Sequence, residues 1–197
     1  MNFYQVIRKI LSDLKRCEWA TNDLLEKYHD KEWGKPLHDD KKLFEFLVLD
    51  GMQAGLSWDI ILRKRTGLRN AFDRFEPKKV AEYGKREISR LLKDEGIIRN
   101  EQKIKSVVNN AQRFLKVQEE FSSFDQYIWS FVEYNIKINK YKKWRNIPST
   151  SKESELMSKD LKRRGFTFVG PTICYAFMQS VGMVNDHVTC CFRYKQV

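Results

Sequence analysis

The sequence of 197 residues contains no run of about 18 consecutive apolar residues, the length that marks a transmembrane helix. It has only four cysteines, and their spacing does not resemble the disulfide framework of a secreted domain. The first residues, MNFYQVIRKILSDLKRC, carry charge in every turn and offer no small-residue cleavage site, which argues against a secretory signal. No segment alternates convincingly between polar and apolar residues, as a half-buried strand does. These absences predict a cytoplasmic protein with an all-α fold and no membrane partner.

Positive charge, in contrast, is in excess. The sequence has 37 lysines and arginines against 26 acidic residues, for a formal net charge of +11. Its apolar fraction of 42% is enough for one compact domain, or for two small lobes that share a core. A soluble protein this basic usually meets a polyanion, most often nucleic acid and less often an anionic membrane surface. Charge alone does not separate these partners.

Helix start and stop signals divide the chain into roughly nine helices without an internal repeat. The apolar period of 3.6 residues predicts an amphipathic helix over residues 1–16. Further helices are expected to begin near Asp39, Ser57, Pro77, Asn100 and Pro171, and to end near Gly51, Gly96, Gly165 and Gly182. Residues 134–154, YNIKINKYKKWRNIPSTSKES, are the most basic and loop-like, which predicts a surface excursion.

The C-terminal stretch NDHVTCC places His187 three and four residues before Cys190 and Cys191. Residues four apart share one face of a helix, and those three apart nearly do, so His187 and either cysteine could bind one ion. Cys17 and His29, near the other end, would complete the Cys2His2 set that structural zinc prefers. The alternative is a group of buried thiols with two ordinary histidines.

The segment GIIRNEQKIKSVV follows LLKDE and predicts a helix, a tight turn and a second helix that begins near Asn100. The amides at that helix start, with Lys103 or Lys105, are expected to face outward together. Free helix N-termini bind phosphate, and helix-hairpin-helix elements hold the DNA backbone in this way. A plain turn between two packed helices is the alternative.

The stretch LDGMQAGLSW combines flexible backbone with Gln53 and Trp58. Asp50 lies in the last turn of a predicted helix, where a carboxylate opposes the macrodipole, so a role such as accepting hydrogen bonds from a base is one interpretation. The other interpretation is an exposed helix end with a small energetic penalty.

Trp19, Tyr28 and Trp33 are also close in sequence, and they either stack on a flipped base or pack beneath the termini.

Five segments and the terminal cysteine occur in the same order in one family. The segments are YHDKEWGKP, KKLFEFLVLDGMQAGLSW, EGIIRNEQKI, WSFV and LKRRGFTFVGPTICYAFMQSVGMVNDHV. They run from about Arg16 to Tyr194, and QAGLSW and FVGPTICYAFMQSVGMVNDH are highly specific. On these segments the chain resembles the DNA-3-methyladenine glycosylase I family of bacterial repair enzymes. The resemblance implies a helix-hairpin-helix DNA glycosylase fold in which one structural zinc ion joins the N- and C-terminal segments.

The resemblance also implies an activity and a set of site residues. The activity is hydrolysis of the N-glycosidic bond of 3-methyladenine that has been flipped out of duplex DNA, by a monomer. The implied zinc ligands are Cys17, His29, His187 and Cys191. The implied catalytic residue is Asp50, and the base-binding residues are Tyr28, Trp33, Gln53 and Trp58. The residues expected to contact the DNA backbone are Gly96, Ile98, Arg99, Asn100 and Lys103.

The domain organisation implied by the resemblance is an extra N-terminal helix followed by one glycosylase unit. The extra helix covers residues 1–16 and the unit covers residues 17–197. Within the unit, a helix-hairpin-helix lobe spans about 39–118, and a second lobe combines 17–38 with 119–197. The turn at Ala54, Gly55 and Leu56 is the candidate wedge that would fill the space of the flipped nucleotide.

Two positions depart from the family pattern. The family has glutamate where this chain has Asp50, which is one methylene shorter, and tyrosine where this chain has Leu25. A shorter carboxylate loosens its contact with the base, by about 1–3 kcal/mol if the hydrogen bond is not made. These departures keep two alternatives open: a non-catalytic DNA-binding or damage-sensing protein, and a glycosylase with shifted specificity, for instance toward 3-methylguanine.

Overall fold

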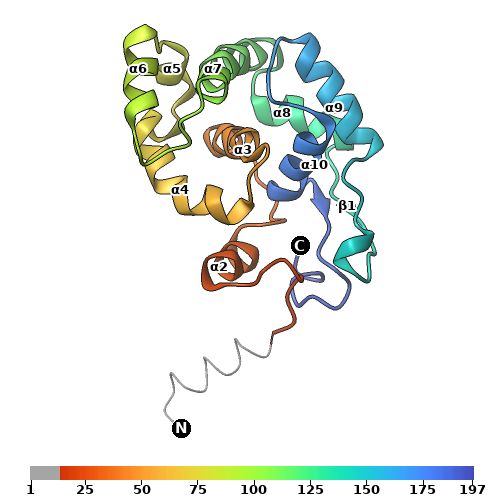
Figure 1. Ribbon diagram of the computed structural model, residues 1–197. Coiled ribbons are helices and arrows are strands. Elements are labelled where there is room, and N and C mark those ends of the chain that lie inside the picture. Colours follow the sequence, from red (N-terminus) through yellow and green to blue (C-terminus); the bar gives the residue numbers. More distant parts are fainter. Residues whose placement is uncertain (1–13) are drawn as a thin grey trace.

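The computed structural model describes residues 14–197, so the helix predicted over residues 1–16 falls almost entirely outside the described part. The described part is mostly helical (Figure 1). Its α-helices are α2 (Asp23–Lys31), α3 (Asp40–Gln53), α4 (Trp58–Ala71), α5 (Pro77–Ala81), α6 (Lys85–Lys93), α7 (Glu101–Phe121), α8 (Phe124–Trp129), α9 (Lys152–Arg163) and α10 (Pro171–Ser180). Short 3-10 turns are η1 (Asp73–Phe75), η2 (Ser130–Val132) and η3 (Trp144–Asn146). Within residues 14–197, no helix is both long and apolar enough to cross a membrane.

The all-α prediction is wrong in one detail, because two short strands are present. Strand β1 (Lys137–Ile138) pairs in parallel with β2 (Val184–Asn185), with Lys137 opposite Val184. A strand of two residues is too short to produce an alternating pattern, so the sequence carries no signal for it. The pair ties the basic loop after α8 to the segment that leads into the C-terminus.

The predicted helix starts are confirmed by their caps. Side-chain oxygens of Asp39, Ser57 and Asn100 accept hydrogen bonds from backbone amides in the first turns of α3, α4 and α7. Two predicted ends are wrong. Helix α3 continues past Gly51 to Gln53, since Gly51 does not adopt the positive φ that ends a helix. Helix α6 ends at Lys93, three residues before Gly96.

Helix α3 is the centre of the fold and contacts α4, α7, α8 and α10 (Figure 1). Nine of its fourteen residues are buried, among them the ring of Phe44, which lies 5.1 Å from that of Phe114 in α7. Because neighbours cover the helix on several sides, polar residues near its end are buried as well. Asp50 is one of them, with an exposed fraction of 1%.

Helix α4 packs against the turn between α6 and α7 through two glycines. A Cβ atom added at Gly67 would lie 2.2 Å from the carbonyl oxygen of Gly96, so the two backbones touch. Gly51 in α3 differs, because a Cβ atom there would meet Phe168 at an ordinary 3.7 Å. Only the first position therefore requires glycine for close approach of two backbones.

Gly67→Ala is expected to destabilise the protein by about 1–3 kcal/mol, because the added methyl group separates α4 from the α6–α7 turn. Gly51→Ala is the matched control, since it also replaces a glycine inside a helix. It is expected to be neutral or to stabilise by up to about 1 kcal/mol, through helix propensity alone. Urea unfolding of both variants checks this. Equal stability changes in the two variants would contradict the close packing of Gly67.

Candidate functional site

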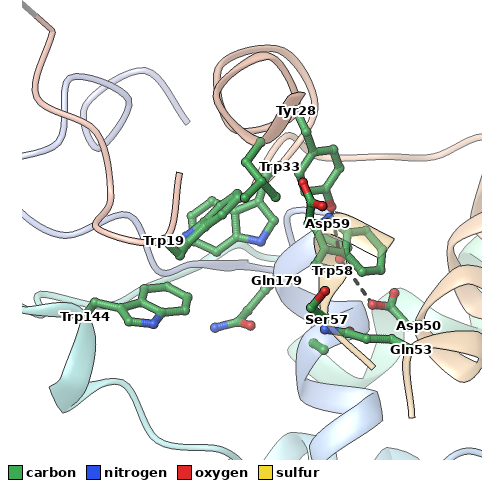
Figure 2. Close-up of a pocket in the computed structure, with 13 residues that line it drawn as sticks. Trp19, Tyr28, Trp33, Asp50, Gln53, Ser57, Trp58, Asp59, Trp144 and Gln179 are labelled. Atoms are coloured by element: carbon green, nitrogen blue, oxygen red, sulfur yellow. Dashed lines mark hydrogen bonds between the residues drawn. The ribbon is translucent and has the colours of Figure 1, made fainter. Parts of the chain in front are cut away.

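A cavity of about 340 Å³ opens where α2, the end of α3, the start of α4 and α10 come together (Figure 2). This volume lies in the range of pockets that hold small molecules. Its lining is mostly aromatic and apolar, with a few polar groups. The lining residues are Trp19, Leu25, Tyr28, Trp33, Asp50, Gln53, Ser57, Trp58, Asp59, Trp144, Ala176, Gln179 and Ser180.

The five residues that were predicted around a base all line this one cavity. Tyr28 and Trp33 come from α2 and the residues after it, whereas Asp50, Gln53 and Trp58 come from α3 and α4. The structure thus brings together side chains that are up to 30 positions apart in the sequence (58 − 28 = 30). The lining also includes Leu25, the position at which the chain departs from the family pattern.

Several lining residues were not predicted as site residues, chiefly Trp144, Gln179 and Ser180. Trp144 belongs to η3 in the basic loop, and its loop-like surroundings gave no reason to place it in a pocket. Gln179 and Ser180 end the apolar helix α10, where a polar pair after eight mostly apolar positions was the available signal. Both residues line the cavity from α10.

The carboxylate of Asp50 is the polar centre of the cavity. The hydroxyl of Ser180 donates a hydrogen bond of 3.5 Å to Oδ1, and the hydroxyl of Tyr28 donates one of 3.2 Å to Ser180. Oδ2 is buried and has no hydrogen-bond partner among the described residues. Burial raises the pKa of Asp50 well above its usual range, against the smaller opposing effect of Ser180. Because Asp50 is buried, the alternative that it lies at an exposed helix end is wrong.

The aromatic lining forms two groups, as Figure 2 shows. Tyr28 and Trp58, with ring centroids 5.4 Å apart, lie beside Asp50. On the other side, Trp19 packs edge-on against Trp33 at 5.1 Å and lies 6.1 Å from Trp144. The first group offers flat electron-rich faces next to a carboxylate, an arrangement that suits a planar ring carrying N–H groups and positive charge.

Four buried side chains beneath this cavity could hold a metal ion: Cys17, His29, His187 and Cys191. Their ligand atoms all lie within 4.8 Å of one another. Cys191 Sγ is 3.4 Å from His29 Nε2 and 3.5 Å from His187 Nδ1, and Cys17 Sγ is 3.7 Å from the same His187 atom. Ligand atoms about 2.1 and 2.3 Å from a tetrahedral zinc ion are roughly 3.6 Å apart. The cluster fits such an ion in both donor type and spacing.

The surroundings of the cluster match those of a metal site. His29 directs its other ring nitrogen, Nδ1, to Asp30 Oδ1 at 2.8 Å, and Arg16 holds that carboxylate. A carboxylate behind a histidine ligand fixes the ring and raises its basicity. Cys190 is exposed and lies outside the cluster, so the alternative in which it replaces Cys191 is wrong. Figure 1 shows how the segment before α2 and the C-terminal segment meet here.

The predicted phosphate-binding turn lies between α6 and α7. Asn100 caps α7 by accepting from the amide of Lys103 at 3.0 Å, and Asp94 Oδ1 accepts from the amide of Gly96 at 2.7 Å. Arg99 and Asn100 are exposed, whereas Ile98 packs partly against the core. The turn therefore presents one cation and the start of a long helix to solvent.

Of the two lysines expected to face outward, Lys105 does and Lys103 does not. Its side chain is buried, and Nζ donates hydrogen bonds to the carbonyl oxygens of Met52 at 2.8 Å and Ala54 at 2.6 Å. The last carbonyl groups of a helix lack partners within the helix, and a cation beside them is stabilising. Lys103 therefore pins the end of α3 and the following turn to α7. Lys105 is the exposed lysine and pairs with Glu101.

Lys103→Met is expected to lower the free energy of unfolding by about 2–4 kcal/mol, because two buried carbonyl groups lose a charged donor. Methionine keeps most of the apolar stem, so packing alone does not account for such a loss. Lys105→Met, two residues along the same helix, removes only an exposed ion pair and is expected to change stability by less than about 1 kcal/mol. Chemical denaturation of the two variants gives the difference, and equal values would refute the pinning role.

Comparison with known proteins identifies the family that this chain matches. A family model described as methyladenine glycosylase matches residues 19–194. The chain is 44% identical over 182 residues to DNA-3-methyladenine glycosylase 1 of Escherichia coli strain K12, covering 92% of this chain and 97% of that protein. It is also 44% identical over 177 residues to DNA-3-methyladenine glycosylase of Haemophilus influenzae, covering 89% of this chain and 96% of that protein.

Solved structures agree with these sequence matches. A crystal structure of 3-methyladenine DNA glycosylase I superposes with a TM-score of 0.88 at 44% identity, covering 90% of this chain and 98% of the other. A structure described as the basis of 3-methyladenine recognition by the Staphylococcus aureus enzyme gives a TM-score of 0.88 at 35% identity, covering 91% and 96%. The fold of the described residues is therefore the fold of these enzymes.

Proposed function

Because the chain belongs to the methyladenine glycosylase family, we propose that it is a base-excision repair enzyme that acts on 3-methyladenine in duplex DNA. It flips the damaged nucleotide, hydrolyses the N-glycosidic bond and leaves an abasic site. The observation that carries this proposal is the buried carboxylate of Asp50, which has an unsatisfied oxygen inside an aromatic cavity.

The chemistry of the substrate explains why so few catalytic groups are needed. Methylation at N3 makes adenine cationic and hence a good leaving group, so the enzyme need not protonate it. The remaining tasks are to extract the base, to hold it, and to stabilise an oxocarbenium-like sugar while water attacks C1′. A cavity that favours a cation over neutral adenine performs the second task and also selects the lesion.

Each lining residue has a proposed role. Tyr28 and Trp58 stack on the base, and their ring faces favour its positive charge. Asp50 accepts a hydrogen bond from the exocyclic amine through Oδ2, while Ser180 holds Oδ1. Gln53 lies beside Asp50 at the end of α3 and binds the edge of the base. Trp33 closes the far side of the cavity toward the Cys2His2 cluster, with its ring centroid 4.6 Å from that of His187.

The shorter side chain at Asp50 fits this role in one respect. Its Oδ2 atom has no partner among residues 14–197, so a ligand N–H would satisfy a group that is otherwise buried and unpaired there. Leu25, where the family pattern has tyrosine, makes the neighbouring wall more apolar. We propose that both departures change the strength of base binding and leave the reaction type the same.

Duplex DNA is the proposed partner, held without sequence preference by a helix-hairpin-helix element. This element consists of α6, the turn and α7, in the lobe that spans about 39–118. Gly96, Ile98, Arg99 and Asn100 are the proposed contacts with the DNA backbone, through amides and the helix N-terminus. Lys103 is no longer among them, since its ammonium group is occupied by two carbonyl oxygens. The turn at Ala54 remains the proposed wedge.

The Cys2His2 cluster is proposed to hold one structural zinc ion. The ion supplies folding free energy by joining the segment before α2 to the C-terminal segment. Cys17, His29, His187 and Cys191 would occupy all four tetrahedral positions, which leaves none for water or substrate. The excision reaction is accordingly assigned to the residues around Asp50.

Incubation with duplex DNA treated with a methylating agent, followed by chromatography of the released bases, tests the proposed activity. Free 3-methyladenine is the expected product, and the other bases released define the specificity. Release of 3-methylguanine in preference would support the shifted-specificity alternative. Tight binding to methylated duplex without any base release would support the non-catalytic alternative.

A further inference from the structure

The loop between η2 and α9, with the first residue of α9, is strongly basic. Between Glu133 and Glu153 there is no acidic residue, and residues 134–152 contain six basic ones, against a net charge of +11 for the whole sequence. The six are Lys137, Lys140, Lys142, Lys143, Arg145 and Lys152. Such a concentration is costly through self-repulsion unless an anion meets it.

Five of these cations have no ion-pair partner among the described residues; Lys152 stands apart at the start of α9, and the other four lie close together in the sequence. Lys137 pairs with Glu153, but Lys140, Lys142, Lys143 and Arg145 form no ion pair with any described residue. All four are exposed. They fall within six consecutive positions, so they form one basic patch, which we define as these four residues.

The basic patch is held in place. On its N-terminal side the amide of Asn139 donates to the carbonyl of Asn185 at 3.2 Å, and Asn139 Nδ2 donates to Asp186 Oδ1 at 2.7 Å. The amide of Thr189 donates to the carbonyl of Tyr141 at 2.9 Å. These contacts fix the loop to the segment that also carries His187. The patch therefore has a defined position, which lowers the conformational entropy lost when it binds.

That position is beside the base cavity. Trp144, the residue between Lys143 and Arg145, lines the cavity and packs against Trp19 and Trp33. Figure 2 shows the Trp144 indole reaching the cavity from the side opposite to Asp50. Arg145 lines an adjoining hollow that shares Trp144 and Gln179 with the cavity, and the backbone of Lys143 is directly bonded to that of Trp144, so this part of the patch lies next to the cavity. The α6–α7 turn is in another part of the fold (Figure 1).

We propose that the basic patch binds the DNA phosphates that flank the flipped nucleotide, as a second backbone contact besides the α6–α7 turn. This inference rests on the proposed function, because it is the base in the cavity that brings its own phosphates to the rim. Lysine and arginine suit this task, since they neutralise phosphate without reading sequence. The patch holds the damaged strand on one side of the cavity, and the turn holds the duplex on the other.

The test compares two quadruple variants of the full-length protein. One carries Lys140→Gln, Lys142→Gln, Lys143→Gln and Arg145→Gln. The matched control carries Lys78→Gln, Lys79→Gln, Lys116→Gln and Lys159→Gln, four exposed lysines on α5, α7 and α9 that line no part of the cavity. Both variants lose the same net charge, so general electrostatic attraction changes equally.

Fluorescence anisotropy measures duplex binding as a function of salt. If two to four phosphates are contacted, the patch variant is expected to bind about 30- to 900-fold more weakly near 0.15 M salt. The negative slope of log K against log salt is expected to become less steep by about 2–4. The control is expected to change affinity by less than about fivefold. An equal loss in the two variants would overturn the proposal.

Neutral methylphosphonate linkages, placed one at a time around the lesion, locate the contact. At a flanking phosphate, the neutral linkage is expected to weaken DNA binding by the parent protein. It should leave DNA binding by the patch variant almost unchanged, because the variant has already lost that contact. Additive effects at every position would overturn the proposal. Binding is measured apart from base release, so a parent protein that binds but releases no 3-methyladenine refutes the proposed function and leaves this test interpretable.

Discussion

Asp50→Ala is expected to reduce the release of 3-methyladenine by about 100-fold or more, while affinity for undamaged duplex stays within about threefold of the parent. The substitution removes the carboxylate proposed to bind the base, whose Oδ2 atom has no hydrogen-bond partner among the described residues. The proposed contacts with duplex DNA lie on other surfaces, so duplex binding is expected to be retained. Single-turnover base release and anisotropy on the same preparation measure the two quantities. Base release by Asp50→Ala at the rate of the parent would refute a role of Asp50 in base recognition.

The buried carboxylate of Asp50 is also expected to lower the free energy of unfolding. The variant Asp50→Asn tests this. Burial raises the pKa of Asp50 in the folded protein, whereas in the unfolded chain it titrates near 3.9. The folded state therefore keeps a proton that the unfolded chain has lost, and stability falls as pH rises from about 4 to the raised pKa. Each tenfold difference between the two acid dissociation constants corresponds to about 1.4 kcal/mol.

Asparagine carries no charge, so Asp50→Asn is expected to be more stable than the parent by about 1–3 kcal/mol at pH 8. Near pH 4 the advantage should disappear, because the parent carboxyl is then protonated. Asp59→Asn is the control at the rim of the same cavity. Hydrogen bonds from Arg63 and Asn22 lower the pKa of Asp59, so its substitution is expected to bring no gain at pH 8. Urea unfolding at both pH values decides, and a stability gain that is the same at pH 4 and pH 8 would contradict the raised pKa.

The starts of the helices were largely predictable, because N-capping depends on residues close in sequence. Ser57 and Asn100 each accept a hydrogen bond from the amide three positions further on, and both caps form as expected. The end of α3 was mispredicted because it depends on a distant residue. Lys103, about 50 positions further along, donates hydrogen bonds to the carbonyl groups of Met52 and Ala54. No local pattern contains that information.

The site was predictable where residue types are rare and chemistry is specific. With three histidines and four cysteines in the sequence, a Cys2His2 set has few possible members, and the cluster gathers four of them. Ser180 shows the opposite case. Serine is common, and nothing in the sequence indicates that its hydroxyl bridges Tyr28 and Asp50. Partners of this kind are determined by helix packing, here of α10 against α3.

Cys17→Ser is expected to have the largest effect on stability of any substitution in the Cys2His2 cluster, if zinc is the resident ion. Elemental analysis of the parent protein should give one zinc per chain, and the variant should have none after dialysis. Apparent binding free energies of structural zinc in small fingers are roughly 10–16 kcal/mol. Here the helical core is expected to fold without the ion, so a smaller loss, on the order of 3–5 kcal/mol, is expected.

Cys190→Ser is the matched control, because this neighbouring thiol is exposed and outside the cluster. It should keep the zinc and the parent stability. A metal-free parent protein whose stability equals that of Cys17→Ser would refute the zinc proposal. The consequence for the reaction is indirect, since Trp33 packs against His187 and also lines the base cavity. Loss of the ion should therefore weaken base binding through the wall that Trp33 forms. The rate of bond cleavage at saturation, which we assign to the residues around Asp50, should fall much less.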